Sequence, residues 1–334
     1  MDVVLLVASF AVILAGALLF TNAVEWAGHR MSMGQGAVGS LLAAVGTAMP
    51  ETLIPVVAIV GGAEGSEDVA IGAIIGAPFL LATLAMMLVG LAALGYKDRR
   101  EQGVNIDAHR ETVERDLIFF LVFFTVGIGL GLGAPDGLRI PLAILFVIAY
   151  GVYVARTLMG GGDVQQVENI GPLTMARPLP PDETSPPVWL IVVQLVVGLG
   201  AIVGGAHLFV EELVAVAESL GIEPLVLSLV LAPLATELPE KANSFFWVRD
   251  GKDSLALGNI AGAMVFQSAI PIAFGLVFTE WDLESFALIS GGLGLVGGGL
   301  AYLVLHRARR FSLPAIVTWG VLYAVFPIYV VVAG

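Results

Sequence analysis

Two short stretches decide the fold: Thr47-Ala48-Met49-Pro50-Glu51 and Thr236-Glu237-Leu238-Pro239-Glu240, each inside a long apolar run. In both stretches a proline, which removes a helical hydrogen bond, stands directly before a carboxylate. A carboxylate at bilayer depth costs about 2.5 to 3.5 kcal/mol on insertion scales, so these glutamates need a compensating partner. A bound metal ion is one such partner.

The composition is that of an integral membrane protein. Of 334 residues, 58% are hydrophobic and 13% charged, and the mean hydropathy is +0.94, well outside the range of soluble domains. At about 20 residues per spanning helix, the apolar runs predict an all-α protein of ten transmembrane helices, near residues 2–24, 34–62, 68–94, 116–134, 138–159, 187–210, 222–247, 254–279, 285–305 and 312–333.

The charged residues predict how the chain sits in the membrane. When the loops are assigned to alternating sides, thirteen of the 15 basic residues fall on one side, Arg139 falls on the other, and Lys241 lies within a helix. The positive-inside rule makes the basic side cytoplasmic and places both termini outside. The outer loops are acidic, which would either concentrate cations or simply form a solvated surface. Neither interpretation involves nucleic acid.

The chain is an internal duplication. A shift of 189 positions aligns residues 16–51 with residues 205–240 without a gap, and a shift of 186 aligns 70–77 with 256–263. Each half is expected to hold five helices, and an odd number inverts the second copy, as in many secondary transporters. We therefore predict a first repeat at 1–159, a cytoplasmic linker at 160–186 and a second repeat at 187–334.

The duplicated motif has the chemistry of a cation site. Pro50 and Pro239 each release a backbone carbonyl one turn earlier, and we expect two broken helices that face each other. Thr47 lies four residues before Glu51, so the two share a helical face; Thr236 and Glu240 are spaced alike. Carboxylates, carbonyls and water are the ligands that Ca²⁺ prefers.

Nearby polar residues are less decisive. Glu237 could share the ion site or pair with Lys241 or Asn243, while Lys241 is expected to snorkel toward the cytoplasm. Gln267 and Asn259 are amides that could reach the centre. The chain contains no HExxH, GxSxG or Walker pattern and no cysteine, so we expect neither an enzyme nor a cofactor.

These motifs resemble the cation/calcium exchanger superfamily, especially prokaryotic sodium/calcium exchangers, whose repeats typically read G-T-S-L-P-E followed by A-L-G-N-x-x-G-S-N-I-F-N. Here the first copy reads Gly46 to Glu51 and the second Ala235 to Glu240, with Ala256-Leu257-Gly258-Asn259 after it. The resemblance implies that Glu51 and Glu240 bind calcium together with backbone oxygens of Thr47 and Thr236. It also implies that the first helix of each half slides as a gate.

The chain departs from that pattern at positions that contribute to sodium binding in the family. The motif serine is Ala48 in one copy and Glu237 in the other; the later serine is Ala77 and Ala263; the closing amide or acid is Leu81 and Gln267. These replacements argue against coupling to three sodium ions. Glu237 is an added acid that could carry a proton instead.

The leading hypothesis is a cell-membrane antiporter that exchanges Ca²⁺, or a similar divalent cation, for Na⁺ or H⁺ by alternating access. The metal would be held between Glu51 and Glu240, with Thr47, Thr236, Glu237 and Gln267 as further ligands. Two alternatives remain open: a monovalent cation/proton antiporter, and a non-transporting membrane sensor or scaffold that binds a cation at the same place. The lipid bilayer is the one other predicted partner.

Overall fold

The computed structural model describes residues 2–30, 49–133, 135–159, 172–176 and 186–333, while a few side chains within the helices, including those of 238–240, lie outside the description. The described elements are helical apart from one isolated bridge between Asn105 and Arg310. In the first half the helices are α1 (Asp2–Arg30), α4 (Met49–Gly61), α5 (Ser66–Leu80), α6 (Met86–Gly95), α7 (Arg110–Leu130) and α8 (Asp136–Met159). In the second half they are α9 (Val188–Leu220), α10 (Pro224–Arg249), α11 (Asp253–Gln267), α12 (Ile270–Phe278), α13 (Ser285–Leu303) and α14 (Leu313–Ala333).

Seven of the described helical segments are long and apolar enough to cross a membrane: Asp2–Arg30, Ser66–Gly95, Gly137–Thr157, Val188–Leu220, Asp253–Phe278, Ser285–Ala308 and Leu313–Val330. Their outward faces carry large apolar side chains that stay exposed, such as Leu18, Ile148 and Val196 at 65%, 57% and 62%. A soluble protein rarely leaves such continuous apolar surface open. These faces are suited to contact with lipid.

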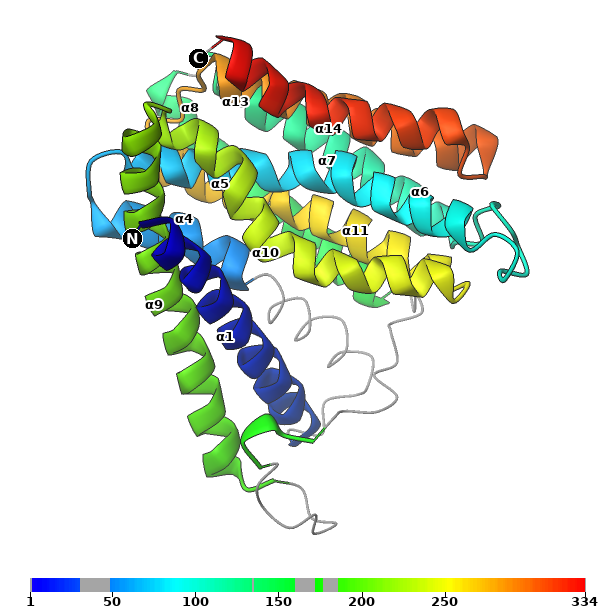
Figure 1. Ribbon diagram of the computed structural model, residues 1–334, viewed down its shortest axis with the longest axis horizontal. Helices are drawn as coiled ribbons and strands as arrows, with labels where there is room; N and C mark the ends of the chain where they lie inside the picture. Colours follow the sequence, from blue (N-terminus) through cyan, green and yellow to red (C-terminus); the bar gives the residue numbers. More distant parts are fainter. Residues whose placement is uncertain (1, 31–48, 134, 160–171, 177–185, 334) are drawn as a thin grey trace.

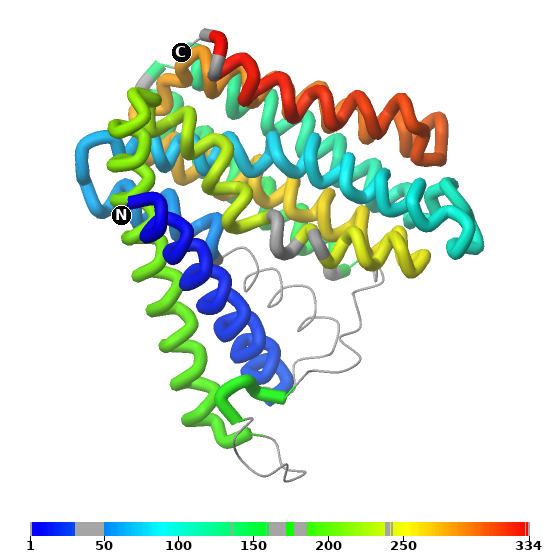
Figure 2. The backbone as a smooth tube through the Cα atoms, viewed as in Figure 1, coloured from blue at the N-terminus to red at the C-terminus, as the bar shows by residue number. Residues whose placement is uncertain are grey.

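The helices form an elongated block with one pair set at an angle to it (Figure 1). Helices α6, α7, α11, α13 and α14 run along the long axis of the block, whereas α1 and α9 lie side by side and lean away from it (Figure 2). Both chain termini lie at the same end of the molecule. Loop 96–109 and the turn at 309–312 lie at the opposite end.

Glycines allow α1 and α9 to touch backbone to backbone. A Cβ added to Gly16 would lie 2.8 Å from the amide nitrogen of Ile202, and one added to Gly198 would lie 2.7 Å from that of Phe20. Small residues of this kind let membrane helices approach closely, which is their main route to packing energy in lipid. The first helices of the two halves therefore form one tightly packed pair.

Helix α5 is the buried centre of the block. Every residue from Val69 to Leu80 is buried, and α5 packs directly on α10. A Cβ on Gly72 would come within 2.7 Å of the Leu225 carbonyl oxygen, and one on Gly76 within 2.4 Å of that of Leu229. The backbones of α5 and α10 therefore approach closely at both glycines. A Cβ added to Gly258, the repeat counterpart of Gly72, would have no described atom of another element within 4 Å.

The predicted end of one helix and the expected break in another need correction. Helix α9 continues to Leu220, ten residues beyond the expected end, because Glu211 and Glu212 remain helical and the helix stops only where Gly221 adopts a left-handed conformation with φ 67°. Helix α10 was expected to break at Pro239 but runs continuously from Pro224 to Arg249. A missing N–H costs one hydrogen bond, and the surrounding packing holds the helix across it.

Candidate functional site

A cluster of buried polar side chains lies halfway along α10. Thr236 is 6% exposed and Glu237 1% exposed, and the Thr236 hydroxyl donates to the carbonyl of Ala232 at 3.1 Å. The Nε2 atom of Gln267, itself 1% exposed, donates to Oε1 of Glu237 at 3.1 Å. The structure therefore brings together two residues that lie 30 positions apart and that the sequence proposed for one site.

Gln267 sits where its membrane-crossing segment is interrupted. Helix α11 ends at Gln267 and α12 begins at Ile270, midway through the apolar segment Asp253–Phe278. Under the repeat shift of 186, Gln267 corresponds to Leu81, and at Leu81 the first-half segment changes to a π-helical turn over Leu81–Ala85. Irregular backbone at membrane depth must be buried in protein or line a cavity. Both halves thus depart from a regular helix at the same repeat position.

The Lys241 side chain is buried and does not extend toward the cytoplasm as the sequence suggested. Its side chain is 2% exposed instead of snorkelling outward, and its Nζ atom donates to Oδ1 of Asn259 at 2.9 Å and lies 3.4 Å from Oε2 of Glu237. Ser244 approaches the same Asn259 oxygen at 3.5 Å. The expectation of snorkelling was wrong because Asn259 and Glu237 hold the ammonium on the side of α10 that packs against α11.

The remaining predicted ligands are only partly described. Glu51 belongs to α4 and is 7% exposed, and α4 contacts both α5 and α10. Thr47 lies outside the described residues, and the same holds for the side chain of Glu240, although its backbone is part of α10. Among the side chains that the structure does describe, no three acidic or histidine groups gather closely enough to hold a metal. The complete ligand set remains a prediction.

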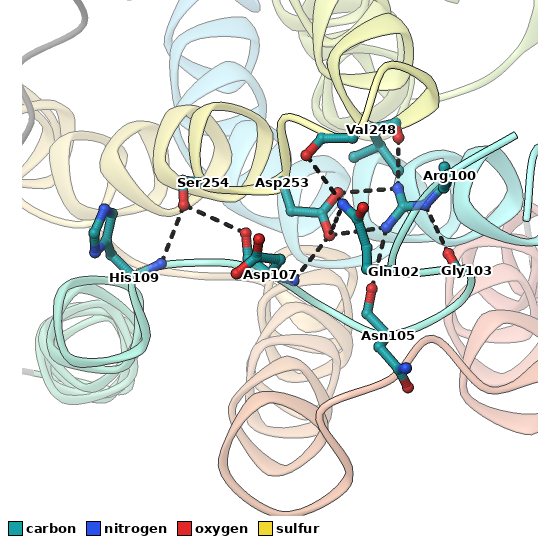
Figure 3. A network of polar contacts seen from close by, with 10 residues as sticks. Arg100, Gln102, Gly103, Asn105, Asp107, His109, Val248, Asp253 and Ser254 are labelled. Carbon is teal, nitrogen blue, oxygen red and sulfur yellow. Dashed lines mark hydrogen bonds and ion pairs between the residues drawn. The ribbon is translucent and has the colours of Figure 1, made fainter.

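A second buried polar network joins the two halves at the end of the molecule that carries loop 96–109 (Figure 3). Arg100 binds Asp253 through two parallel hydrogen bonds of 2.9 and 2.8 Å, and neither side chain is exposed. The same guanidinium donates to the carbonyls of Gly103, at 2.7 Å, of Asn105, at 3.1 Å, and of Val248. This planar fork with five donors is geometry that only arginine supplies.

Asp253 is held from several sides. Its Oδ2 atom also accepts from the backbone N–H of Asp107 at 3.0 Å, and Gln102 donates to the carbonyl of Gly251 at 3.0 Å (Figure 3). These contacts fix the turn between α10 and α11 against the loop that follows α6. Sequence reasoning missed the network because Arg100 is one of many loop cations and its partner lies 153 residues away. No local pattern marks such a pair.

The fold is shared with solved cation exchangers. A structure of the H⁺/Ca²⁺ exchanger CAX superposes with a TM-score of 0.73 at 20% identity, covering 99% of this chain and 82% of that one. A structure of the sodium-calcium exchanger NCX_Mj gives a TM-score of 0.57 at 20% identity, with 97% of each chain covered. At this level of identity the likeness establishes the fold.

Sequence comparison gives the family. The inner membrane protein YrbG of Escherichia coli (strain K12) is 24% identical over 256 residues, covering 75% of this chain and 71% of YrbG. A family model described as "Sodium/calcium exchanger protein" matches residues 1–159 and 190–333, nearly the whole chain. Together with the apolar spans, these matches identify a multi-pass membrane protein. The chain belongs to the sodium/calcium exchanger protein family.

Proposed function

We propose that this protein is a secondary-active antiporter that exchanges Ca²⁺, or a similar divalent cation, for Na⁺ or H⁺. The observation that carries the proposal is the contact between Gln267 and Glu237, which places a carboxylate and an amide in the interior of an apolar helical block. Polar and ionisable groups at such depth mark ion pathways more often than they stabilise a fold. Family membership points to the same conclusion.

In this proposal the ion binds between Glu51 and Glu240. Thr47 and Thr236 add backbone oxygens, and Glu237 and Gln267 complete or adjust the ligand set. Such a set of carboxylate, carbonyl and amide oxygens meets the preference of Ca²⁺ for six to eight hard oxygen ligands, roughly 2.3 to 2.6 Å from the ion. The interruption between α11 and α12 after Gln267 supports this proposal, because irregular backbone at membrane depth must be buried in protein or line a cavity.

The transport cycle follows from the layout. We propose ten membrane helices in two inverted repeats, residues 1–159 and 187–334, with both termini outside and the linker 160–186 in the cytoplasm. Alternating access then comes from movement of the α1–α9 pair against the block. The backbone contact at Gly16 and Gly198 favours movement of the two helices together.

The test is uptake of radioactive calcium by proteoliposomes under an imposed Na⁺ or H⁺ gradient. Wild-type protein is expected to accumulate calcium under at least one gradient, and Glu51→Gln and Glu240→Gln are each expected to abolish it. Glu64→Gln is the matched control, because Glu64 is an exposed acid in the loop after α4. Normal transport by both site variants would show that the ion binds elsewhere.

The same vesicles separate the other possibilities. A monovalent cation/proton antiporter would change the internal pH when a Na⁺ or K⁺ gradient is applied, with no calcium uptake. A sensor or scaffold would be stabilised thermally by calcium without any flux. Both an H⁺ gradient and a Na⁺ gradient must be tested, because the solved structures with this fold are named for H⁺/Ca²⁺ exchange and for sodium-calcium exchange.

A further inference from the structure

Lys241 places a positive charge inside the polar cluster of α10 and α11. Its ammonium contacts two oxygens, Oε2 of Glu237 at 3.4 Å and Oδ1 of Asn259 at 2.9 Å, and the Ser244 hydroxyl approaches the same Asn259 oxygen at 3.5 Å. Carboxylate, amide and hydroxyl oxygens are hard ligands of the kind that bind unsolvated cations. The surroundings of the ammonium are therefore those of a cation site.

Stability alone does not account for this lysine. Removing an ammonium and a carboxylate from water costs several kcal/mol for each ion, and well-packed apolar residues of similar size are often at least as stable as a buried ion pair. Apolar side chains are also accommodated in this interior, since Leu257, Ile260 and Met264 of α11 are at most 2% exposed. A charge retained here at that cost is expected to have a use beyond folding.

We propose that the Lys241 ammonium is a tethered cation, which occupies the position beside Glu237 that a free monovalent cation would otherwise fill. This inference rests on the proposed function and adds a consequence to it. The Glu237 charge is balanced at every stage by a cation that cannot leave, so it requires no free counter-ion. The exchange cycle then uses one monovalent cation fewer than it would use if the same carboxylates were present and the lysine were absent.

The test measures thermal stability of the purified full chain in detergent, with NaCl, KCl or choline chloride at constant ionic strength. Lys241→Met leaves the Glu237 carboxylate buried without its ammonium, and we expect this variant to gain a saturable stabilisation by Na⁺ or K⁺ that choline does not reproduce. Glu237→Gln/Lys241→Met removes both charges, and its cation response should return to that of the wild type. Identical cation responses in all three proteins would overturn the proposal.

If Lys241→Met yields no folded protein in any salt, the comparison moves to Glu237→Gln with and without Lys241→Met. Glu237→Gln keeps the ammonium but removes its carboxylate, so we expect its calcium concentration for half-maximal stabilisation to be at least tenfold higher than that of the double variant. Equal concentrations, or no calcium response in either variant, would overturn the tethered cation.

These measurements are independent of transport. A wild-type protein that moves no calcium under any gradient would refute the proposed antiport, yet the gain of a cation response in Lys241→Met would still establish the tether. If the wild type transports calcium but Lys241→Met gains no cation response, the antiport is supported and the tethered cation is refuted. In transporting vesicles, the number of charges moved per calcium should change by one between the wild type and Lys241→Met.

Discussion

The Nζ atom of Lys241 lies 3.4 Å from Oε2 of Glu237, one turn away on α10, and the two side chains are 2% and 1% exposed. The spacing of four residues places both on one face of the helix, and that face is turned toward Asn259 and Gln267 of α11. A negative and a positive charge thus lie together in the interior of the block. Glu237 cannot be considered as an ion ligand apart from this lysine.

Arg100 and Asp253 are expected to be the most sensitive charged pair for stability. Asp253→Ala leaves the buried guanidinium without its carboxylate, and removing one partner of such a pair costs about 3 to 5 kcal/mol. The melting temperature in detergent reports the loss. Arg100→Lys should also destabilise, because an ammonium cannot replace the fork that reaches Gly103, Asn105 and Val248.

The control for that pair is Arg249→Ala. Arg249 and Asp250 form an ion pair with side chains 37% and 49% exposed, and exposed pairs contribute only about 0 to 1 kcal/mol. A melting temperature that falls equally for Arg249→Ala and Asp253→Ala would contradict the structural role given to the buried network.

Gly76→Ala tests the contact between α5 and α10. The added Cβ would lie 2.4 Å from the Leu229 carbonyl oxygen and 2.8 Å from Cγ of Pro233, so the two helices must separate. We expect a lower melting temperature and impaired transport. Gly299→Ala is the matched control in α13, where no described atom lies within 4 Å of the new Cβ; there alanine should be neutral or stabilise by about 0.5 to 1 kcal/mol.

Gln194→Leu tests how α1 and α9 are held together. The fully buried Gln194 amide donates to the Leu19 carbonyl and to Oδ1 of Asn22, each at 2.9 Å, and accepts from the N–H of Met175 at 2.9 Å. Each buried group left unsatisfied costs about 1 to 3 kcal/mol. Because Asn22 shares the network, Asn22→Leu and Gln194→Leu should be less than additive when combined; strict additivity would argue against a single network.

We expect the carboxyl group of Glu223 to make the stability of the protein depend on pH in the acidic range. Partial burial, followed by repulsion from Glu284 and Asp68, raises the pKa of Glu223 above its ordinary value. A raised carboxyl pKa favours the folded state below the ordinary pKa, and this contribution is lost as the pH rises through the folded value. Glu223→Gln should therefore melt at a higher temperature than the wild type near neutral pH, and the difference should vanish at about pH 4.

The control at this position is Glu223→Asp, which keeps a titratable carboxylate among the same neighbours. Its melting temperature should follow the wild-type pH dependence. A Glu223→Gln difference that stays constant from acid to neutral pH would show that the carboxylate charge is not the cause.

Much of the fold could be predicted from local pattern. The predicted spans at 68–94, 138–159 and 285–305 lie within three residues of the observed segments Ser66–Gly95, Asp136–Met159 and Ser285–Ala308, because apolar length is a direct record of the bilayer. The end of α9 could not be predicted in this way. Hydropathy falls at Glu211, but charged residues at a helix end do not stop a helix.

The candidate site was predicted less completely. Residue type and depth in an apolar run sufficed to select Glu237 and Gln267, since buried polar groups in membrane helices are costly and seldom incidental. Their mutual contact and the orientation of Lys241 required the packing of α10 on α11. Thr47 and the Glu240 side chain lie outside the described part of the chain, so their roles rest on the duplicated motif.

By itself, therefore, the sequence determined a duplicated, multi-pass membrane protein with a Pro-Glu motif in each half, because hydropathy and repeats are properties of residue order. Only the tertiary structure decided which charges meet. Lys241 contacts Asn259, which lies 18 residues further along the chain. Glu237 contacts Gln267 across 30 residues, and Arg100 contacts Asp253 across 153 residues. Helix packing determines which of these groups meet. Because an unpaired charge in a buried, apolar setting is very costly, the stability of the fold depends on these contacts.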